Sequence, residues 1–348
     1  MRELIIDNVV INDKSECFVI AEVGHNHQGS VDTAKQIFVK AKEAGADAVK
    51  LQKRNNKQLF TKEMYDSDYD SRNAYGDTYG THRDALEFGL EEYVELQQYA
   101  NELGLIFFAT PFDFPSVDFL EKLNVPMYKI ASGDLKSTPL LKYVAQTGKP
   151  VLVSTGGGEM DDVQRAFDVI TAENPNIAIL QCTAAYPCEP EEMNLNVITT
   201  FRDNFPNKVI GLSDHQSGIS MALVAFTLGA RIVEKHFTLN RAWKGTDHAF
   251  SLEPQGLTKL VRDLRRAKVS LGDGEKKSLE KEKAPLFKMG KKLVAACDLK
   301  KGKIITDSDI TIKSPNDGLS PYEWDNVIGL TLLEDLKKDE NISFDDLS

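Results

Sequence analysis

The chain has 348 residues, enough for one barrel domain of about 250 residues and a second, smaller domain. Its hydrophobic fraction of 41% and its charged fraction of 27% argue against intrinsic disorder. The net charge of −11 disfavours nucleic acid as a partner, because phosphate contacts need clustered cations. Neither a signal-peptide core nor an apolar run of roughly 18 residues is present, so we expect a cytoplasmic protein with no membrane partner.

Eight short apolar runs punctuate residues 18–235, and each ends in polar residues. In chain order they are FVIAEV, AVKL, LIFFA, MYKIA, VLV, IAILQC, VIGL and RIVEK. Helical stretches lie between most of them, so the pattern predicts an α/β fold of the (β/α)₈ TIM-barrel type. In that fold the residues just past each strand build the active site. We therefore look for chemistry at the eight strand ends.

The segments between the strands show ordinary helix signals, with one exception. Helices are expected over 31–44, where Ser30 is an N-cap and Gly45 a stop, over 90–103 and over 254–271. A long insertion, about 53–89, follows the second strand. It reads either as a binding loop or lid over the site, or as a solvated surface loop. Its cationic and aromatic residues could contact a ligand: Arg54, Arg72, Arg83, Tyr75 and Tyr79.

The composition changes from Gly272 onward. An almost entirely charged stretch, 273–283, is followed by a β-rich segment with Lys-Gly and Asp-Gly turns. We therefore expect a barrel domain over 1–275, a linker over 276–285 and a small β-rich domain over 286–348. Because about 60 residues form only a marginal core, the small domain is expected to dock on something.

Two histidines are the candidate metal ligands. His215 ends the seventh strand and His236 the eighth, and neighbouring strand ends in a barrel lie side by side. The two imidazoles could share a divalent metal. Glu22, which ends the first strand, would lie next to them around the ring.

Two lysines and four hydroxyl residues are candidates for binding an anion. Lys50 and Lys129 lie in otherwise apolar strands, where an ammonium is costly to bury without a partner. They predict capture of a carboxylate or phosphate, a salt bridge to Glu22 or Asp134, or both. Hydroxyl groups at four other strand ends suit an oxyanion-rich ligand: Thr110, Ser132, Ser154 and Ser213. Tyr186 and Asp247 add polar groups for a polyhydroxylated substrate.

A competing barrel hypothesis fails on its ligand count. His25 and His27 have the His-x-His spacing of metal-dependent amidohydrolases, and Lys129 could serve as their strand-four lysine. That family also needs histidines after strands five and six, which here end in Ser154-Thr155 and Cys182-Thr183.

Nine ordered motifs at the strand ends resemble the sialic acid synthase family, the phosphoenolpyruvate-dependent synthases of N-acetylneuraminate and related nonulosonates. They are EVGHNHQGS, KLQ, ATPFD, KIASGD, STGG, CTAAYP, GLSDH, EKHFTL and GTDHAFS. The C-terminal segment resembles the antifreeze-like (SAF) domain that these enzymes carry.

The resemblance implies a reaction and a role for each candidate. Phosphoenolpyruvate condenses with an open-chain aldose of the N-acetylmannosamine type, and phosphate is released. His215 and His236 would hold Mn²⁺, with Mg²⁺ or Co²⁺ as alternatives. The residues that bind phosphoenolpyruvate would be Lys50, Thr110, Lys129, Ser132, Ser154 and Ser213. The residues that face the sugar and the attacking water would be Glu22, Gln52, Tyr186 and Asp247. The catalytic residues would be Glu22, Lys50, Lys129, Asp134 and Asp247. The carboxylate that activates the water would be either Glu22 or Asp134. The family arrangement also implies a domain-swapped homodimer.

The sequence departs from the family where the sugar is recognised. Ser314 stands where the small domain of the family carries an arginine, Ala184 replaces a usual asparagine, and Asp134 a usual glutamate. A serine has no guanidinium fork, so we expect an acceptor other than plain N-acetylmannosamine. Alternatives are a synthase of a related 2-keto-3-deoxy sugar acid that acts on a non-N-acetylated or phosphorylated aldose, and a carbohydrate-binding protein.

Overall fold

The computed structural model describes residues 2–348. The chain divides into a unit that ends at Gly272 and a second unit from Asp273 to Ser348. The first unit therefore ends three residues before the expected boundary at 275, and the charged stretch belongs to the second.

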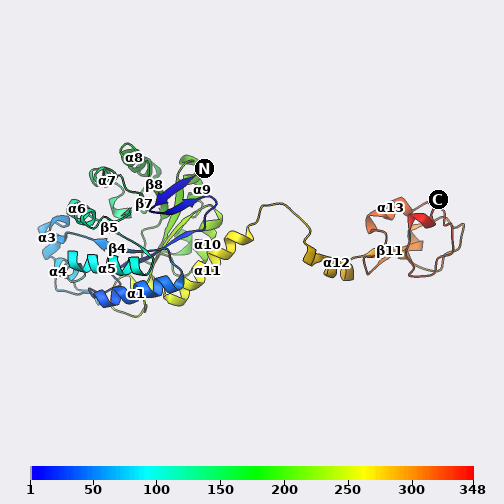
Figure 1. Cartoon of the computed structure of the whole chain (residues 1–348), viewed down its shortest axis with the longest axis horizontal. Helices are drawn as coiled ribbons and strands as arrows, with labels where there is room; N and C mark the ends of the chain where they lie inside the picture. The colour runs from blue at the N-terminus through cyan, green and yellow to red at the C-terminus, as the bar shows by residue number, and fades with distance from the viewer. Residues whose placement is uncertain (1) are drawn as a thin grey trace. The chain divides into compact units, whose positions relative to one another are not determined.

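Eight parallel strands close into a barrel in the first unit (Figure 1). The strands are β3 (Phe18–Gly24), β4 (Ala48–Lys53), β5 (Ile106–Pro111), β6 (Tyr128–Ile130), β7 (Val151–Ser154), β8 (Ile177–Cys182), β9 (Val209–Asp214) and β10 (Ile232–His236). β10 pairs with β3 and closes the ring. The predicted barrel is confirmed, and each expected apolar run contributes one strand.

A ring of helices follows the strands. These are α1 (Val31–Ala44), α5 (Leu90–Glu102), α6 (Phe114–Lys122), α7 (Thr138–Ala145), α8 (Met160–Thr171), α9 (Val197–Asn204), α10 (Ser220–Thr227) and α11 (Pro254–Ser270). Local sequence explains their limits in α1, where the Ser30 side chain accepts a hydrogen bond from the Thr33 amide and Gly45 closes the helix at φ 88°. Single-turn 3₁₀ segments occur over Ser132–Asp134, Pro190–Glu192 and His248–Phe250.

An N-terminal hairpin that the sequence analysis missed plugs one end of the barrel. Strands β1 (Glu3–Ile6) and β2 (Val9–Asn12) are antiparallel, and they pack Leu4, Ile6 and Ile11 into the barrel interior. Their neighbours there include Phe18, Ala48, Val209 and Ile232, the first residues of their strands. The hairpin therefore fills the N-terminal end and leaves the C-terminal end open.

The insertion after β4 is folded and anchored. It contains the short helices α2 (Asn56–Leu59), α3 (Lys62–Asp66) and α4 (Tyr79–Asp84). The Tyr75 hydroxyl donates to the Lys244 carbonyl at 2.6 Å, and the Gly245 amide donates to Asn73 Oδ1 at 3.2 Å. Both acceptor and donor belong to the loop after β10, so the insertion forms a wall at the C-terminal side of the barrel.

The second unit is small and partly β. It contains α12 (Lys283–Met289), the antiparallel pair β11 (Lys292–Ala295) and β12 (Ile310–Lys313), and α13 (Trp324–Val327). Single-turn segments cover Glu280–Glu282, Asp307–Asp309, Pro321–Glu323 and Phe344–Asp346. It has a core of its own, which includes Leu293, Ile310 and Leu332. None of the helices within residues 2–348 has the length and apolarity to cross a bilayer.

Candidate active site

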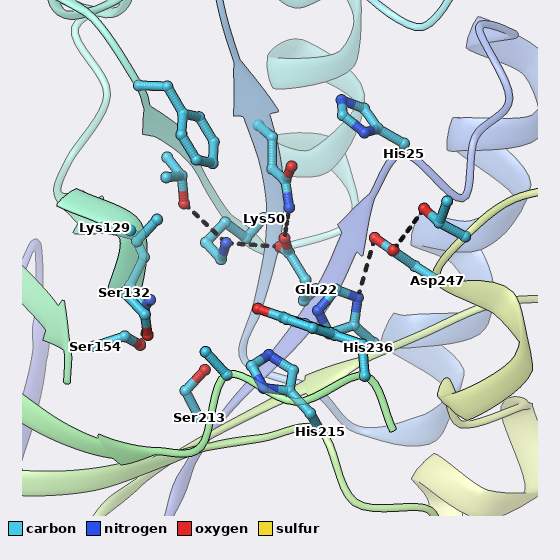
Figure 2. A pocket seen from close by; sticks show the side chains of 18 of the residues that line it. Glu22, His25, Lys50, Lys129, Ser132, Ser154, Ser213, His215, His236 and Asp247 are labelled. Atoms are coloured by element: carbon cyan, nitrogen blue, oxygen red, sulfur yellow. Dashed lines mark hydrogen bonds and ion pairs between the residues drawn. The ribbon is translucent and has the colours of Figure 1, made fainter. Parts of the chain in front are cut away.

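A cavity of about 680 Å³ opens at the C-terminal end of the barrel. Every predicted site residue lines it except Asp134. The lining carries four cationic side chains and three carboxylates, although the chain as a whole has a net charge of −11. Figure 2 shows the side chains converging from different strands on this space.

A cluster of two ammoniums and two carboxylates, the inner cluster, lies in the cavity. It consists of Glu22, Lys50, Lys129 and Glu234, each at most 4% exposed. Lys50 Nζ lies 2.9 Å from Glu22 Oε2, and Glu234 lies 3.7 Å from Lys50 and 3.6 Å from Lys129. The sequence analysis missed Glu234. The signal for it was a charged residue within an apolar strand. Glu234 lies two positions before His236, which places both side chains on the same face of the strand.

Burial and ion pairing shift the pKa values of the two carboxylates in opposite directions. Burial raises the pKa of Glu22, and repulsion from Glu234 adds to it against the attraction of Lys50. Burial would raise the pKa of Glu234 as well, but Lys129 and Lys50 outweigh burial and hold that pKa below its usual range. Glu234 is therefore the permanent counterion of the two lysines, whereas Glu22 is the carboxylate that more readily holds a proton.

The predicted hydroxyl groups extend the inner cluster. Lys50 donates to Thr110 at 2.9 Å and Lys129 to Ser154 at 2.6 Å. Ser213 donates to Glu234 at 2.9 Å. The remaining member, Ser132, accepts from the Gly156 amide at 3.0 Å, and a Cβ on Gly156 would lie only 2.8 Å from the Ser132 hydroxyl. The glycine of the STGG motif is thus required by packing against Ser132.

The two candidate metal ligands meet as expected. The rings of His215 and His236 lie 5.4 Å apart between centroids. His215 Nδ1 donates to the Thr183 carbonyl at 2.8 Å, which leaves Nε2 with its lone pair, as is usual for metal-binding histidines. His236 Nδ1 is buried without a hydrogen-bond partner and lies 3.7 Å from Asp247 Oδ2.

This donor set fits a divalent metal held by two imidazoles. Across residues 2–348 no three His, Cys, Asp or Glu side chains form a ready-made metal cluster. Other ligands would therefore have to be water or substrate oxygens, as in catalytic sites that keep open positions.

Gly24 explains how the sugar-facing residues come together. Its φ of +52° is the left-handed region, and a Cβ there would lie 3.3 to 3.4 Å from Asp247 Oδ2, Gln52 Nε2 and Glu22 Oε1. Gln52 also donates to Glu22 at 2.8 Å. The missing side chain at position 24 lets these three residues, from separate elements, meet at one point.

Asp134 lies apart from the cavity lining, at the end of the 3₁₀ segment Ser132–Asp134. Burial raises its pKa to about 6, with Arg54 opposing and Asp113 adding to the shift. Its predicted contact with Lys129 is absent among the ion pairs of the described residues, where Lys129 pairs with Glu234. The predicted salt bridge between Lys50 and Glu22 is present at 2.9 Å, and Lys129 pairs with Glu234 in place of Asp134.

Two of the five insertion residues that we expected to make contacts, Arg54 and Arg83, line the cavity, whereas Arg72, Tyr75 and Tyr79 do not. The lining also includes residues to which the sequence analysis gave no role in this site: His25, Asn73, Phe112 and Thr246. The insertion supplies Arg54, Asn73 and Arg83 to the lining, which favours a binding wall over a solvated loop. His27, by contrast, stacks on Phe88 at 4.2 Å and does not line the cavity.

Family models match both parts of the chain. Residues 37–276 match the NeuB family, and residues 292–348 match the SAF domain. The chain is 40% identical to human N-acetylneuraminate-9-phosphate synthase over 95% of this chain and 93% of that protein. It is 35% identical to N,N'-diacetyllegionaminic acid synthase of Campylobacter jejuni over 93% and 98% of the two chains.

A solved structure agrees with these matches. The N-acetylneuraminic acid synthetase of Leptospira borgpetersenii superposes with a TM-score of 0.71 at 31% identity, over 82% of this chain and 95% of that one. The resemblance seen in the strand-end motifs is confirmed: the chain belongs to the NeuB family and is an enzyme of the sialic acid synthase type with a C-terminal SAF domain.

Proposed function

We propose that this enzyme condenses phosphoenolpyruvate with the open-chain form of an N-acetylmannosamine-type aldose, to give a nonulosonic 2-keto-3-deoxy acid and phosphate. The observation that carries the proposal is the inner cluster. Two ammoniums, each 3% exposed, share one permanent counterion and are surrounded by hydroxyl groups. Buried cations in a cavity suit a small, highly charged anion such as phosphoenolpyruvate.

In the proposed reaction C3 of the enol forms a bond to the aldehyde carbon, and water adds at C2. The C–O bond to phosphate then breaks from the tetrahedral intermediate. Lys50 and Lys129 hold the anionic substrate and stabilise charge that develops on it. Glu22 is the better placed of the two candidate carboxylates for handling the water proton, because it lines the cavity and Asp134 does not.

We propose that His215 and His236 hold a divalent cation, with Mn²⁺ first and Mg²⁺ or Co²⁺ as alternatives. When bound, the metal supplies Lewis-acid polarisation of the aldehyde oxygen. The free imidazole lone pair of His215 and the unpartnered Nδ1 of His236 support the assignment. Asp247, beside His236, would orient the ring and face the sugar.

The names of two relatives, which specify N-acetylneuraminate-9-phosphate and N,N'-diacetyllegionaminic acid, support an acceptor of the amino-sugar class. In this chain Ala184 lines the cavity, and Ser314 accepts a hydrogen bond from Lys291 at 2.7 Å. A lysine beside Ser314 keeps positive charge at that point of the SAF unit without the planar fork of an arginine.

We further propose that the enzyme is a homodimer in which the SAF unit contributes to the partner's site. Its α12 helix exposes three large apolar side chains, Leu286, Phe287 and Met289, at 51%, 52% and 67%. Such side chains on one short helix favour burial against another surface. Light scattering coupled to size-exclusion chromatography should give the mass of two chains, and a monomer at micromolar concentration would refute this part.

The reaction is tested by incubating the enzyme with phosphoenolpyruvate, a panel of hexoses and Mn²⁺, and reading phosphate release and product mass. Release should require all three components. Activity should be lost in EDTA and return with added Mn²⁺. Full activity in chelator would overturn the metal assignment, and a product mass that lacks the pyruvate-derived carbons would overturn the condensation.

A further inference from the structure

Two arginines at the rim of the cavity have no acidic partner. Arg54 follows β4 and Arg83 lies in α4 of the insertion, and both line the cavity. Within the described part of the chain, neither guanidinium has a carboxylate oxygen within 4.0 Å; their nearest contacts are neutral. Arg54 donates to Gln52 Oε1 at 2.7 Å and stacks over the Phe112 ring at 3.7 Å. Arg83 donates twice to the Tyr79 hydroxyl, at 3.1 and 2.9 Å.

Both guanidiniums also contact the same imidazole. Arg54 Nη1 lies 3.0 Å from His25 Nε2, and Arg83 Nη1 lies 3.4 Å from His25 Nδ1. Burial, together with the two arginine charges, lowers the pKa of His25 well below its usual range, so the ring is neutral. A neutral imidazole has one acceptor nitrogen and one N–H. It can therefore accept from only one guanidinium, and the shorter contact identifies Arg54.

The remaining donors have no acceptor to share. Whichever ring nitrogen of His25 carries the hydrogen, that N–H faces a guanidinium N–H, so that two donors point at each other. Such an arrangement is unfavourable by itself, because buried donors lose their hydration without compensation. An oxygen-rich anion placed beside Arg83 and His25 would accept from both.

The neighbouring carboxylates are engaged mainly by other groups. Glu87 Oε2 accepts from Lys53 at 3.0 Å, whereas its buried Oε1 has no hydrogen-bond partner and lies 4.0 Å from His25 Nε2. Asp247 lies against His236 and accepts from Thr246 at 2.8 Å. Arg54 keeps its charge at neutral pH, since burial lowers its pKa only to about 10. The rim therefore presents two guanidinium charges that no carboxylate pairs with directly, although Glu87 and Asp247 act on Arg54 at longer range.

The rim lies apart from the Lys129 end of the inner cluster and is linked to Glu22 through Gln52, which accepts from Arg54 at 2.7 Å and donates to Glu22 at 2.8 Å. In Figure 2 His25 is on the opposite side of the view from Lys129, Ser132 and Ser154, with Lys50, Glu22 and His236 between them. A substrate anchored on the inner lysines and an anion at the rim would therefore occupy different parts of the cavity. The acceptor aldose must fill the space between the inner lysines and the rim, so its far end is the part that reaches the rim.

We propose that Arg54, Arg83 and His25, here called the rim cluster, bind a phosphate monoester at the end of the acceptor aldose farthest from its aldehyde. This proposal rests on the proposed function and names its acceptor class. Guanidinium forks match phosphate oxygens in pairs, and a dianion would neutralise the two unpaired charges. The enzyme would accordingly act on a sugar phosphate and release a product that keeps the ester.

The test compares N-acetylmannosamine 6-phosphate with N-acetylmannosamine as acceptors, each with phosphoenolpyruvate and Mn²⁺. Wild-type kcat/KM should be at least about tenfold higher for the phosphorylated sugar. Arg83→Gln should lower that value by about 10- to 100-fold, the worth of one or two charge-assisted hydrogen bonds. The loss with the unphosphorylated sugar should be smaller than the loss with the phosphorylated sugar, and the KM for phosphoenolpyruvate should change less than about twofold. Arg72→Gln is the matched control, because Arg72 is an exposed arginine of the same insertion.

Three outcomes would overturn the rim assignment. They are a wild-type preference for the unphosphorylated sugar, an equal loss for both sugars in Arg83→Gln, and a rise in the KM for phosphoenolpyruvate. If neither sugar is turned over, the proposed function fails, and a binding measurement then tests the rim assignment separately. N-acetylmannosamine 6-phosphate should then still raise the melting temperature of the wild type more than of Arg83→Gln, and an equal rise in both would refute the subsite.

Discussion

The inner cluster and the rim cluster treat charge in opposite ways. The inner lysines come from barrel strands and are paired with Glu22 and Glu234 at 2.9 to 3.7 Å. The rim arginines come from the insertion after β4, and the side chains that their guanidiniums contact directly are neutral. A compensated cluster on strands is stable without a ligand, whereas uncompensated charge on a loop wall needs one. We therefore propose that the inner cluster serves the chemistry and that the rim cluster selects the acceptor.

The largest expected effect is on the stability of the inner cluster. Glu234→Gln leaves Lys50 and Lys129 with one remaining carboxylate, and we expect the free energy of unfolding to fall by about 3–5 kcal/mol, as for other broken buried pairs. Urea denaturation measures the change. The control is Glu43→Gln, since Glu43 forms an exposed pair with Lys40 that contributes about 0–1 kcal/mol. Equal losses in the two variants would contradict the idea of a compensated unit.

Lys129→Met tests whether the inner cluster acts in the reaction of every acceptor, phosphorylated or not. We expect kcat/KM to fall by about 10²- to 10³-fold, the usual cost of removing one charge-stabilising donor, and to fall equally with phosphorylated and unphosphorylated acceptors. Lys57→Met, at an exposed lysine, should leave both rates unchanged. A loss confined to the phosphorylated acceptor would place Lys129 with the rim and remove the distinction.

Asp134→Asn tests the carboxylate that belongs to neither cluster. Because burial raises its folded pKa from 3.8 to about 6, the native state holds the proton more tightly than the unfolded chain. The free energy of unfolding of the wild type should therefore fall, by on the order of 2 kcal/mol, as the pH rises from about 4 to about 6. The asparagine variant should lack this decrease while keeping most activity. Urea titrations at pH 4 and pH 7 measure it, and loss of turnover would return Asp134 to the catalytic groups.

The smallest effect on activity is expected at the hydrogen bond that ties the insertion to the loop after β10. Tyr75→Phe removes the hydrogen bond to the Lys244 carbonyl, worth about 1 kcal/mol, so the KM of the phosphorylated acceptor should rise about fivefold. Tyr322→Phe, at a hydroxyl that is 95% exposed, is the control. An unchanged KM would show that the insertion holds Arg83 in place without this link to the loop after β10.

Much of the barrel could be predicted because its signals are local. An apolar run followed by polar residues reports a buried strand and its end, and the Ser30 and Gly45 caps mark the limits of α1. The N-terminal hairpin was missed, since two four-residue strands carry little periodicity and become recognisable only when Leu4, Ile6 and Ile11 enter the barrel. The course of the insertion was also beyond prediction, because its three short helices depend on contacts with the loop after β10.

The sequence by itself determined the barrel and most of the strand-end residues that face the cavity, because strand alternation and strand ends place side chains on known sides of a barrel. Its strand-end motifs also identified the family. Only the tertiary structure decided how the charges pair. It made Glu234 the counterion of the lysines and left Asp134 outside the cavity lining. It also brought His25 between Arg54 and Arg83, which lie 29 and 58 positions away along the chain. Pairing depends on distances of a few ångströms between distant segments, and no local pattern encodes those distances.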